Sequence, residues 1–159
     1  MCQNIEDREK KLVFIYSLDG LIEYKIALFI QRFINPSKIE CPLYSIIYDQ
    51  KGLKPEFTEA MKRIELDIPY ELLYRNDFIK KYDCFEIFGK FHVSDVTYPS
   101  IYIIIGHEKE EREIYELVPT EDILKCSDIA DLNRILSEKY DQFKTIGPEE
   151  FKKMDCRKV

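Results

Sequence analysis

The stretch that decides the fold is VTYPSIYIII, which runs from Val96 to Ile105. Its second half, Ile101 to Ile105, is apolar or aromatic without a break, which predicts a central strand buried on both faces. β-Branched residues dominate this run, and they favour a strand over a helix. Pro99 stands at the entrance of the strand, where its missing N–H removes no hydrogen bond from the sheet.

The composition indicates one globular domain. The chain has 159 residues, of which 45% are hydrophobic and 34% are charged, and its net charge is -6. We expect a single domain with its core over residues 11–140 and a charged C-terminal tail over residues 143–159. The acidic balance, with no basic block, disfavours nucleic acid and anionic membranes as partners.

The N-terminal residues and the cysteines bear on the compartment. Residues 1–11 lack the apolar segment of a signal peptide, and no stretch reaches the ~20 apolar residues of a spanning helix, so we expect a cytoplasmic protein. The five cysteines show no Cys-x-x-Cys spacing, which fits reduced, inert thiols. We expect no cofactor and no metal, because the spacing of His92 to Asp95 and Cys84 matches no standard metal site.

Strand and helix patterns alternate along the rest of the chain. Before the Pro-led strand we expect strands over residues 12–16, 43–48 and 69–74, helices over residues 21–34, 54–64 and 77–82, and a loop over residues 83–97. After it we expect an antiparallel strand over residues 113–118, a turn from residue 120, a helix over residues 128–140 and a short helix over residues 148–154. Strand, helix and strand at the start predict a βαβ unit, with strands 12–16 and 43–48 parallel.

The predicted helix from Leu21 to Ile34 carries a wide apolar stripe. Ile26, Phe29 and Ile30 lie at its centre. The first interpretation is a helix wedged between the sheet and a neighbouring helix. The second is a self-association surface, which would make the protein a homodimer.

The order of these elements resembles the thioredoxin-like fold. The resemblance rests on Leu12 to Gly20, which lead into a long helix, and on Tyr98-Pro99-Ser100, which lead into an apolar strand. It implies an α/β domain with three layers, α/β/α, and a mixed central sheet of about five strands. It also implies that the Tyr98–Pro99 peptide bond is cis. The runner-up is a flavodoxin-like fold, which the tight reversal between residues 105 and 113 disfavours because that fold needs a fully parallel sheet.

The chain is also similar to a family of small, uncharacterised bacterial proteins over residues 11–16, 44–48 and 75–82. Some members of that family carry a GTPase assignment. The residues here do not support that activity. The only Gly-Lys pair begins at Gly89, and Cys84 and Phe91 stand where a P-loop needs a glycine and a serine or threonine.

The turn after the first strand departs from the thioredoxin pattern. A thioredoxin-type enzyme carries Cys-x-x-Cys there, whereas this turn reads SLDGLIE, from Ser17 to Glu23. Disulfide exchange needs a thiolate, which a serine hydroxyl cannot replace, so we expect no dithiol oxidoreductase activity. The predicted βαβ unit places Cys41 at the opposite end of the sheet, which leaves Cys84 as the candidate monothiol.

Two functions stay open. The first is a non-catalytic, thioredoxin-like binding or interaction domain, whose unknown small-molecule or protein ligand docks in a crevice lined by Ser17, Asp19, Tyr98 and Pro99. Taken alone, Asp19 could simply cap the following helix and Tyr98 could simply pack. The second is an enzyme: a cysteine-dependent monothiol oxidoreductase, or another small enzyme that uses the crevice beside Pro99.

Overall fold

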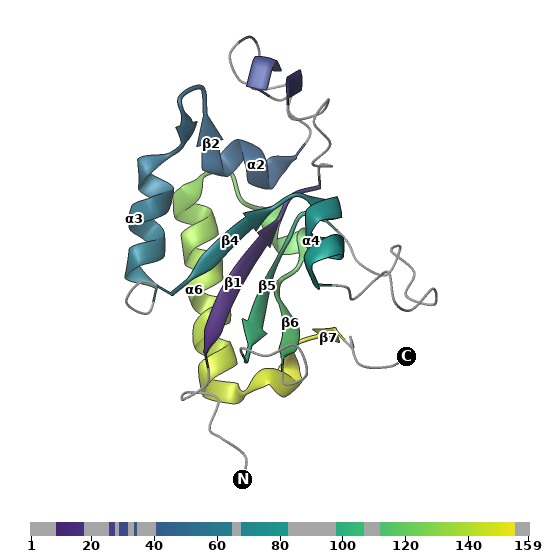
Figure 1. Cartoon of the computed structure of the whole chain (residues 1–159). Coiled ribbons are helices and arrows are strands. Elements are labelled where there is room, and N and C mark those ends of the chain that lie inside the picture. Colours follow the sequence, from purple (N-terminus) through teal and green to yellow (C-terminus); the bar gives the residue numbers. More distant parts are fainter. Residues whose placement is uncertain are drawn as a thin grey trace.

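The structure, a computed structural model, describes residues 9–17, 26–27, 29–31, 34, 41–64, 68–82, 98–106 and 112–154. It is a mixed α/β protein built on a sheet with the strand order β4-β1-β5-β6-β7 (Figure 1). The four longer strands are β1 (Lys10–Ile15), β4 (Tyr70–Leu73), β5 (Ser100–Ile105) and β6 (Glu113–Val118). A two-residue strand, β7 (Lys153–Met154), pairs with β6 at the edge.

The Pro-led strand lies at the centre of this sheet, as predicted. All residues of β5 are buried. It pairs antiparallel with β1 on one side, where Ser100 lies opposite Ile15, and antiparallel with β6 on the other. The peptide bond between Tyr98 and Pro99 is cis, which confirms that prediction.

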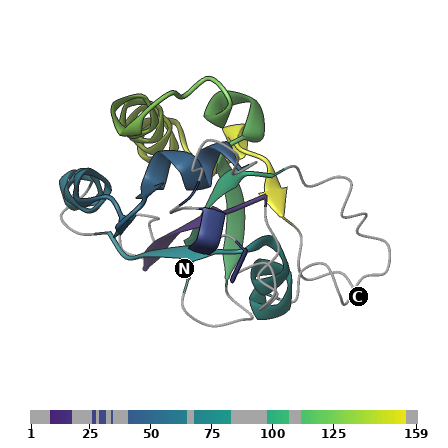
Figure 2. The same cartoon turned by 90° about the horizontal axis from the view of Figure 1, so that it is seen from above.

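Helices cover both faces of the sheet (Figure 2). On one face lie α2 (Pro42–Ile47), α3 (Pro55–Arg63), α5 (Thr120–Ile123) and α6 (Ile129–Ile146). On the other face lies α4 (Arg75–Tyr82), whose Phe78 packs with Val13 and Tyr102. Alternate residues of β1 and β5 therefore feed two separate apolar clusters, because neighbouring side chains of a strand point to opposite faces.

The prediction of a strand over residues 43–48 is wrong, because this segment forms helix α2. Four of its six residues are buried, so the helix is apolar on almost every side. A short, mostly apolar run, interrupted here only by Ser45, does not distinguish a buried helix from a buried strand. Pro42 occupies the first helical position, where proline is favoured because its missing N–H has no intrahelical partner.

The predicted parallel pairing of strands 12–16 and 43–48 is wrong for the same reason. The parallel partner of β1 is β4, with Phe14 opposite Leu72. The connection between them contains α2, the short hairpin of β2 (Tyr48–Asp49) and β3 (Gly52–Leu53), and α3. β4 lies at the edge of the sheet, as the preceding proline predicted.

The other boundaries follow the predictions with small shifts. α4 begins at Arg75, so Asn76 lies inside the helix and does not cap it. α6 continues to Ile146, beyond the predicted end at residue 140, and is capped at its start by Asp128. The predicted helix over residues 148–154 is instead a 3₁₀ turn, Pro148–Glu150, followed by β7. The predicted loop over residues 83–97 lies outside the described residues.

Part of the predicted helix over residues 21–34 falls within the described residues, and positions 26–27, 29–31 and 34 are helical. Its apolar side chains are not covered: Ile26, Phe29, Ile30 and Ile34 are 57%, 55%, 49% and 77% exposed. The interpretation of a helix wedged against the sheet is therefore wrong for these residues. Self-association through them stays a prediction.

Candidate functional site

The residues predicted to line a crevice meet at one end of the sheet. Ser17 follows the end of β1, and Tyr98 and Pro99 precede the start of β5. Because Ile15 pairs with Ser100 in an antiparallel ladder, the register places Ser17 and Tyr98 at the same end of the two neighbouring strands. The fourth predicted residue, Asp19, lies outside the described residues.

The structure adds Cys41 to this end of the sheet. The backbone N–H of Ser17 donates a hydrogen bond to Sγ of Cys41, with 3.4 Å between the nitrogen and the sulfur. The prediction that Cys41 lies at the opposite end is therefore wrong. It depended on a strand at residues 43–48, whereas the helix that actually follows Cys41 begins beside the end of β1.

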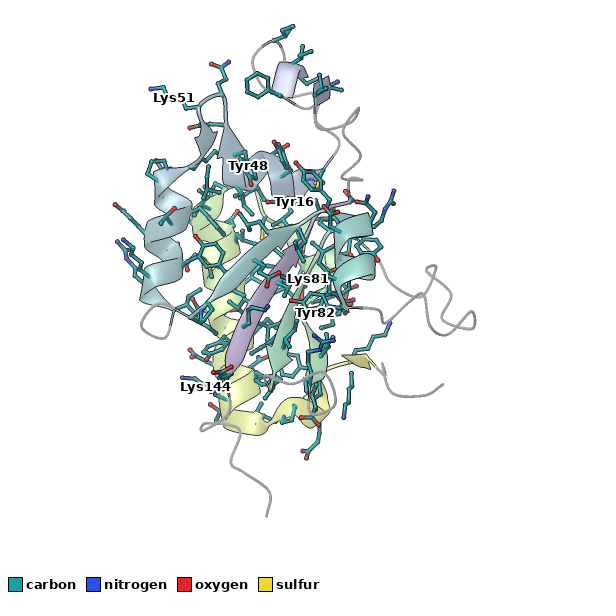
Figure 3. All side chains as sticks on the ribbon, viewed as in Figure 1. Tyr16, Tyr48, Lys51, Lys81, Tyr82 and Lys144 are labelled. Carbon is teal, nitrogen blue, oxygen red and sulfur yellow. The ribbon has the colours of Figure 1, made fainter. Side chains whose placement is uncertain are left out.

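A cluster of tyrosines holds α2 against the end of β1 (Figure 3). The ring of Tyr16 meets those of Tyr44, Tyr48 and Tyr74 edge-on, with centroids 5.3, 6.1 and 5.4 Å apart. Tyr44 and Tyr48 stack with centroids 4.3 Å apart, and the Tyr16 hydroxyl lies 3.2 Å from that of Tyr48. Burial, reinforced by these neighbours, raises the pKa of Tyr16, so its phenol stays neutral and cannot act as a base.

Two helices fix the β5 side of this site. The hydroxyl of Thr120, at the start of α5, donates a hydrogen bond to the carbonyl oxygen of Pro99 at 2.7 Å. The guanidinium of Arg75, at the start of α4, lies 5.9 Å from the centre of the Tyr98 ring, within the range of a cation–π contact. Pro99 and Tyr98 are thus positioned from opposite faces of the sheet.

The described thiols are packing groups in this conformation. Cys41 is 0% exposed and Cys126 is 8% exposed. Burial raises the pKa of Cys126 and so disfavours its thiolate. A nucleophilic thiol must reach its substrate, and neither sulfur does so here. What this end of the sheet can offer is the Ser17 hydroxyl and the aromatic surface of Tyr98.

A cluster of charged and aromatic side chains joins β1, β4 and α4 on the face of the sheet that α4 covers. Figure 3 shows two of its members, Lys81 and Tyr82. The carboxylate of Glu71 accepts hydrogen bonds from Lys11 and from Lys81, the latter at 2.7 Å. Burial alone would raise the pKa of Glu71, but the two lysines outweigh it and lower the pKa. The guanidinium of Arg112 lies 4.9 Å from the centre of the Tyr82 ring. This cluster joins elements of the fold.

Searches over the described residues and comparisons with known proteins add no assignment. In that part of the chain, no group of three or more His, Cys, Asp or Glu side chains is placed to hold a metal ion. Nor does any helix found there combine the length and the apolarity needed to cross a membrane. Protein-family models, curated proteins and solved structures were compared with the chain, and none of them matches.

Proposed function

We propose that this chain is a thioredoxin-like domain that acts by binding and not by thiol chemistry. The order of elements supports the fold. A parallel pair, β1 and β4, is joined through helices; then come α4, a Pro-led strand, its antiparallel neighbour β6 and the closing helix α6. The helices on both faces of the sheet support the proposed three-layer α/β/α arrangement.

The observation that carries the absence of thiol chemistry is the burial of Cys41 beside Ser17. The turn that carries Cys-x-x-Cys in a thioredoxin-type enzyme begins here with Ser17, and among the described thiols the one beside it, Cys41, is fully covered. A buried sulfur adds apolar contact area but cannot attack a disulfide. The surface that remains here is that of Ser17 and of the partly exposed Tyr98, beside the buried Pro99, and a small molecule or a peptide would dock on it.

The catalytic half of the proposal is tested by reduction of insulin with dithiothreitol. We expect the wild-type protein to give the rate of dithiothreitol alone, and Cys41→Ser and Cys84→Ser to give the same rate. Turnover above that background which disappears in one variant would overturn the proposal and identify that cysteine as the nucleophile.

The binding half is tested by filling the site. Ser17→Trp places a large ring at the end of β1, whereas Ser45→Trp places the same ring on the exposed side of α2. A small molecule that co-purifies with the wild type, identified by mass spectrometry, should be lost from Ser17→Trp and retained by Ser45→Trp. Equal retention in the two variants would place the ligand elsewhere.

The position of Cys41 also favours a second candidate, a monothiol oxidoreductase. The thiol lies at the right end of the sheet, and only its burial opposes the activity. An opening of α2 would expose it. Labelling of the folded protein with Ellman's reagent, followed by peptide mass spectrometry, separates the candidates, because an enzyme needs Cys41 to react no more than about a hundredfold more slowly than an accessible thiol.

A further inference from the structure

A cavity of about 670 Å³ opens between α3 and α6, away from the end of the sheet described above. The two helices lie side by side and run in the same direction (Figure 1). Small side chains, Ala60 of α3 and Ala130 of α6, line it together with Ile129. The helices therefore approach each other without filling the space between them, and the volume lies within the range of small-molecule sites.

The charges along this cavity are separated by sign. Along the first half of α3 and the start of α6, it is lined by four carboxylates, Asp49, Glu56, Glu59 and Asp128, against one ammonium group, Lys54. Further along, it is lined by two guanidinium groups, Arg63 and Arg134. Glu56 and Arg63 are seven residues apart on one face of α3, which at 1.5 Å per residue separates them by about 10 Å.

Some of these groups have no partner among the residues that the structure describes. Asp128 caps α6 and Arg134 lies 3.7 Å from Asp131, so both are engaged within the protein. Within the described residues, by contrast, the side chains of Glu56 and Arg63 have no hydrogen bond or ion pair.

An uncharged hydrogen-bond acceptor in the same cavity is also unsatisfied. In the described part of the chain, Oδ1 of Asn133 is buried and receives no hydrogen bond. Asn133 lines the same cavity. Buried polar atoms nearly always have a partner, and this oxygen is an acceptor that the described residues leave unsatisfied.

We propose that this groove binds a short peptide of about three residues with free amino and carboxyl termini, since an extended chain spans about 3.3 Å per residue. The peptide ammonium group lies at the acidic end near Glu56, and the peptide carboxylate pairs with Arg63. A backbone N–H of the peptide donates to Oδ1 of Asn133. This site is independent of the sheet-end site proposed above.

The charge pattern disfavours other classes of ligand. A polyamine would match the carboxylates, but its second ammonium group would face Arg63 and Arg134. A phosphate compound would match the guanidinium groups, but it would be repelled at the other end. A zwitterion whose charges are separated by the length of a tripeptide matches both ends. In the reversed orientation its ammonium group would face the guanidinium groups and its carboxylate would face the carboxylates, and this repulsion opposes it.

The test uses trialanine as the probe and titrates it into the whole protein, followed by two-dimensional NMR or by calorimetry. We expect saturable binding of trialanine. N-acetyl-trialanine and trialanine amide should each bind at least about tenfold more weakly, because each loses one charge-assisted hydrogen bond.

Two variants locate the interaction. Arg63→Gln should weaken trialanine binding to the level of the amide and leave binding of the amide unchanged. Lys62→Gln makes the same change of charge on a neighbouring exposed residue outside this cavity and should have no effect. A lack of saturable binding up to about 10 mM would overturn the proposal. So would equal binding of the capped peptides, or preferential binding of spermidine or inorganic phosphate used as competing probes.

Discussion

Replacement of Tyr16 tests whether the tyrosine cluster holds α2 on the end of β1. Tyr16 is 1% exposed and combines a buried ring with one hydrogen bond, from its hydroxyl to that of Tyr48 at 3.2 Å. Tyr16→Phe removes only the hydroxyl. Because Tyr48 is only half-buried and can bind water instead, the loss should be about 0.5–1.5 kcal/mol.

Tyr16→Ala also removes the ring, together with its edge-on contacts to Tyr44 and Tyr74. Truncation of a buried aromatic residue to alanine costs about 3–5 kcal/mol. For a domain of this size each kcal/mol lowers Tm by about 2–4 °C, so we expect Tyr16→Ala to melt about 6–20 °C below the wild type. Urea and thermal unfolding, followed by circular dichroism, measure both variants.

Reactivity of Cys41 distinguishes local loosening from global loss of stability. Since Tyr16 packs against α2, Tyr16→Ala should raise the labelling rate of Cys41 by Ellman's reagent at least about tenfold. Phe57→Ala is the matched control, because Phe57 is as deeply buried but its ring contacts are with Phe14 of β1 and Tyr70 of β4. Equal labelling in the two alanine variants would refute the role of the cluster, and so would a Tyr16→Phe variant as unstable as Tyr16→Ala.

Three further predictions concern other parts of the chain. Because the pKa of Glu71 is lowered in the folded protein, its carboxylate stabilises the fold above the unfolded pKa of about 4.3, and this stabilisation is lost as the pH falls through the folded pKa. In urea titrations the wild type should therefore lose more free energy of unfolding between neutral and acid pH than Glu71→Gln does. Gly147, which ends α6 at a φ of 106°, should lose about 1–3 kcal/mol on change to alanine, and an unchanged urea midpoint would show that alanine accepts this conformation. If the exposed helix pairs two chains, light scattering should give the mass of a dimer for the wild type and of a monomer for Ile30→Glu. A wild type that is monomeric at micromolar concentration would refute this pairing.

The sequence predicted the parts of the fold in which two signals agree. In β5 an unbroken β-branched run follows a proline, and strand propensity and position both indicate a strand. In α6, polar residues separate apolar residues at helical spacing over several turns, so that periodicity and length both indicate a helix. Residues 43–48 offered only an apolar run, which is compatible with either structure, and propensity favoured the wrong one. The fold around α2, and not α2 itself, decides between them.

The site was predicted only in part, for a related reason. The structure brings Ser17, Tyr98 and Pro99 to one end of the sheet because they adjoin two strands whose assignment was correct, and their role in binding stays a prediction. Cys41 was misplaced because its position depended on the segment that follows it. The Tyr16 cluster could not be predicted either, since it requires residues from β1, α2 and the end of β4 to converge.

The free energy of opening α2 decides between the two proposed functions. A buried thiol reacts only from an opened state, so its rate is the rate of a free thiol multiplied by the open fraction. If Cys41 is exposed only by global unfolding, with a stability of about 5–15 kcal/mol, its reactivity is suppressed by roughly 10³- to 10¹¹-fold, and catalysis through it is excluded in practice. A local opening that costs less than about 3 kcal/mol would suppress it by only about a hundredfold, which a slow oxidoreductase could tolerate. The labelling rate of Cys41 in the folded protein therefore measures the quantity that separates a binding domain from an enzyme that acts through Cys41.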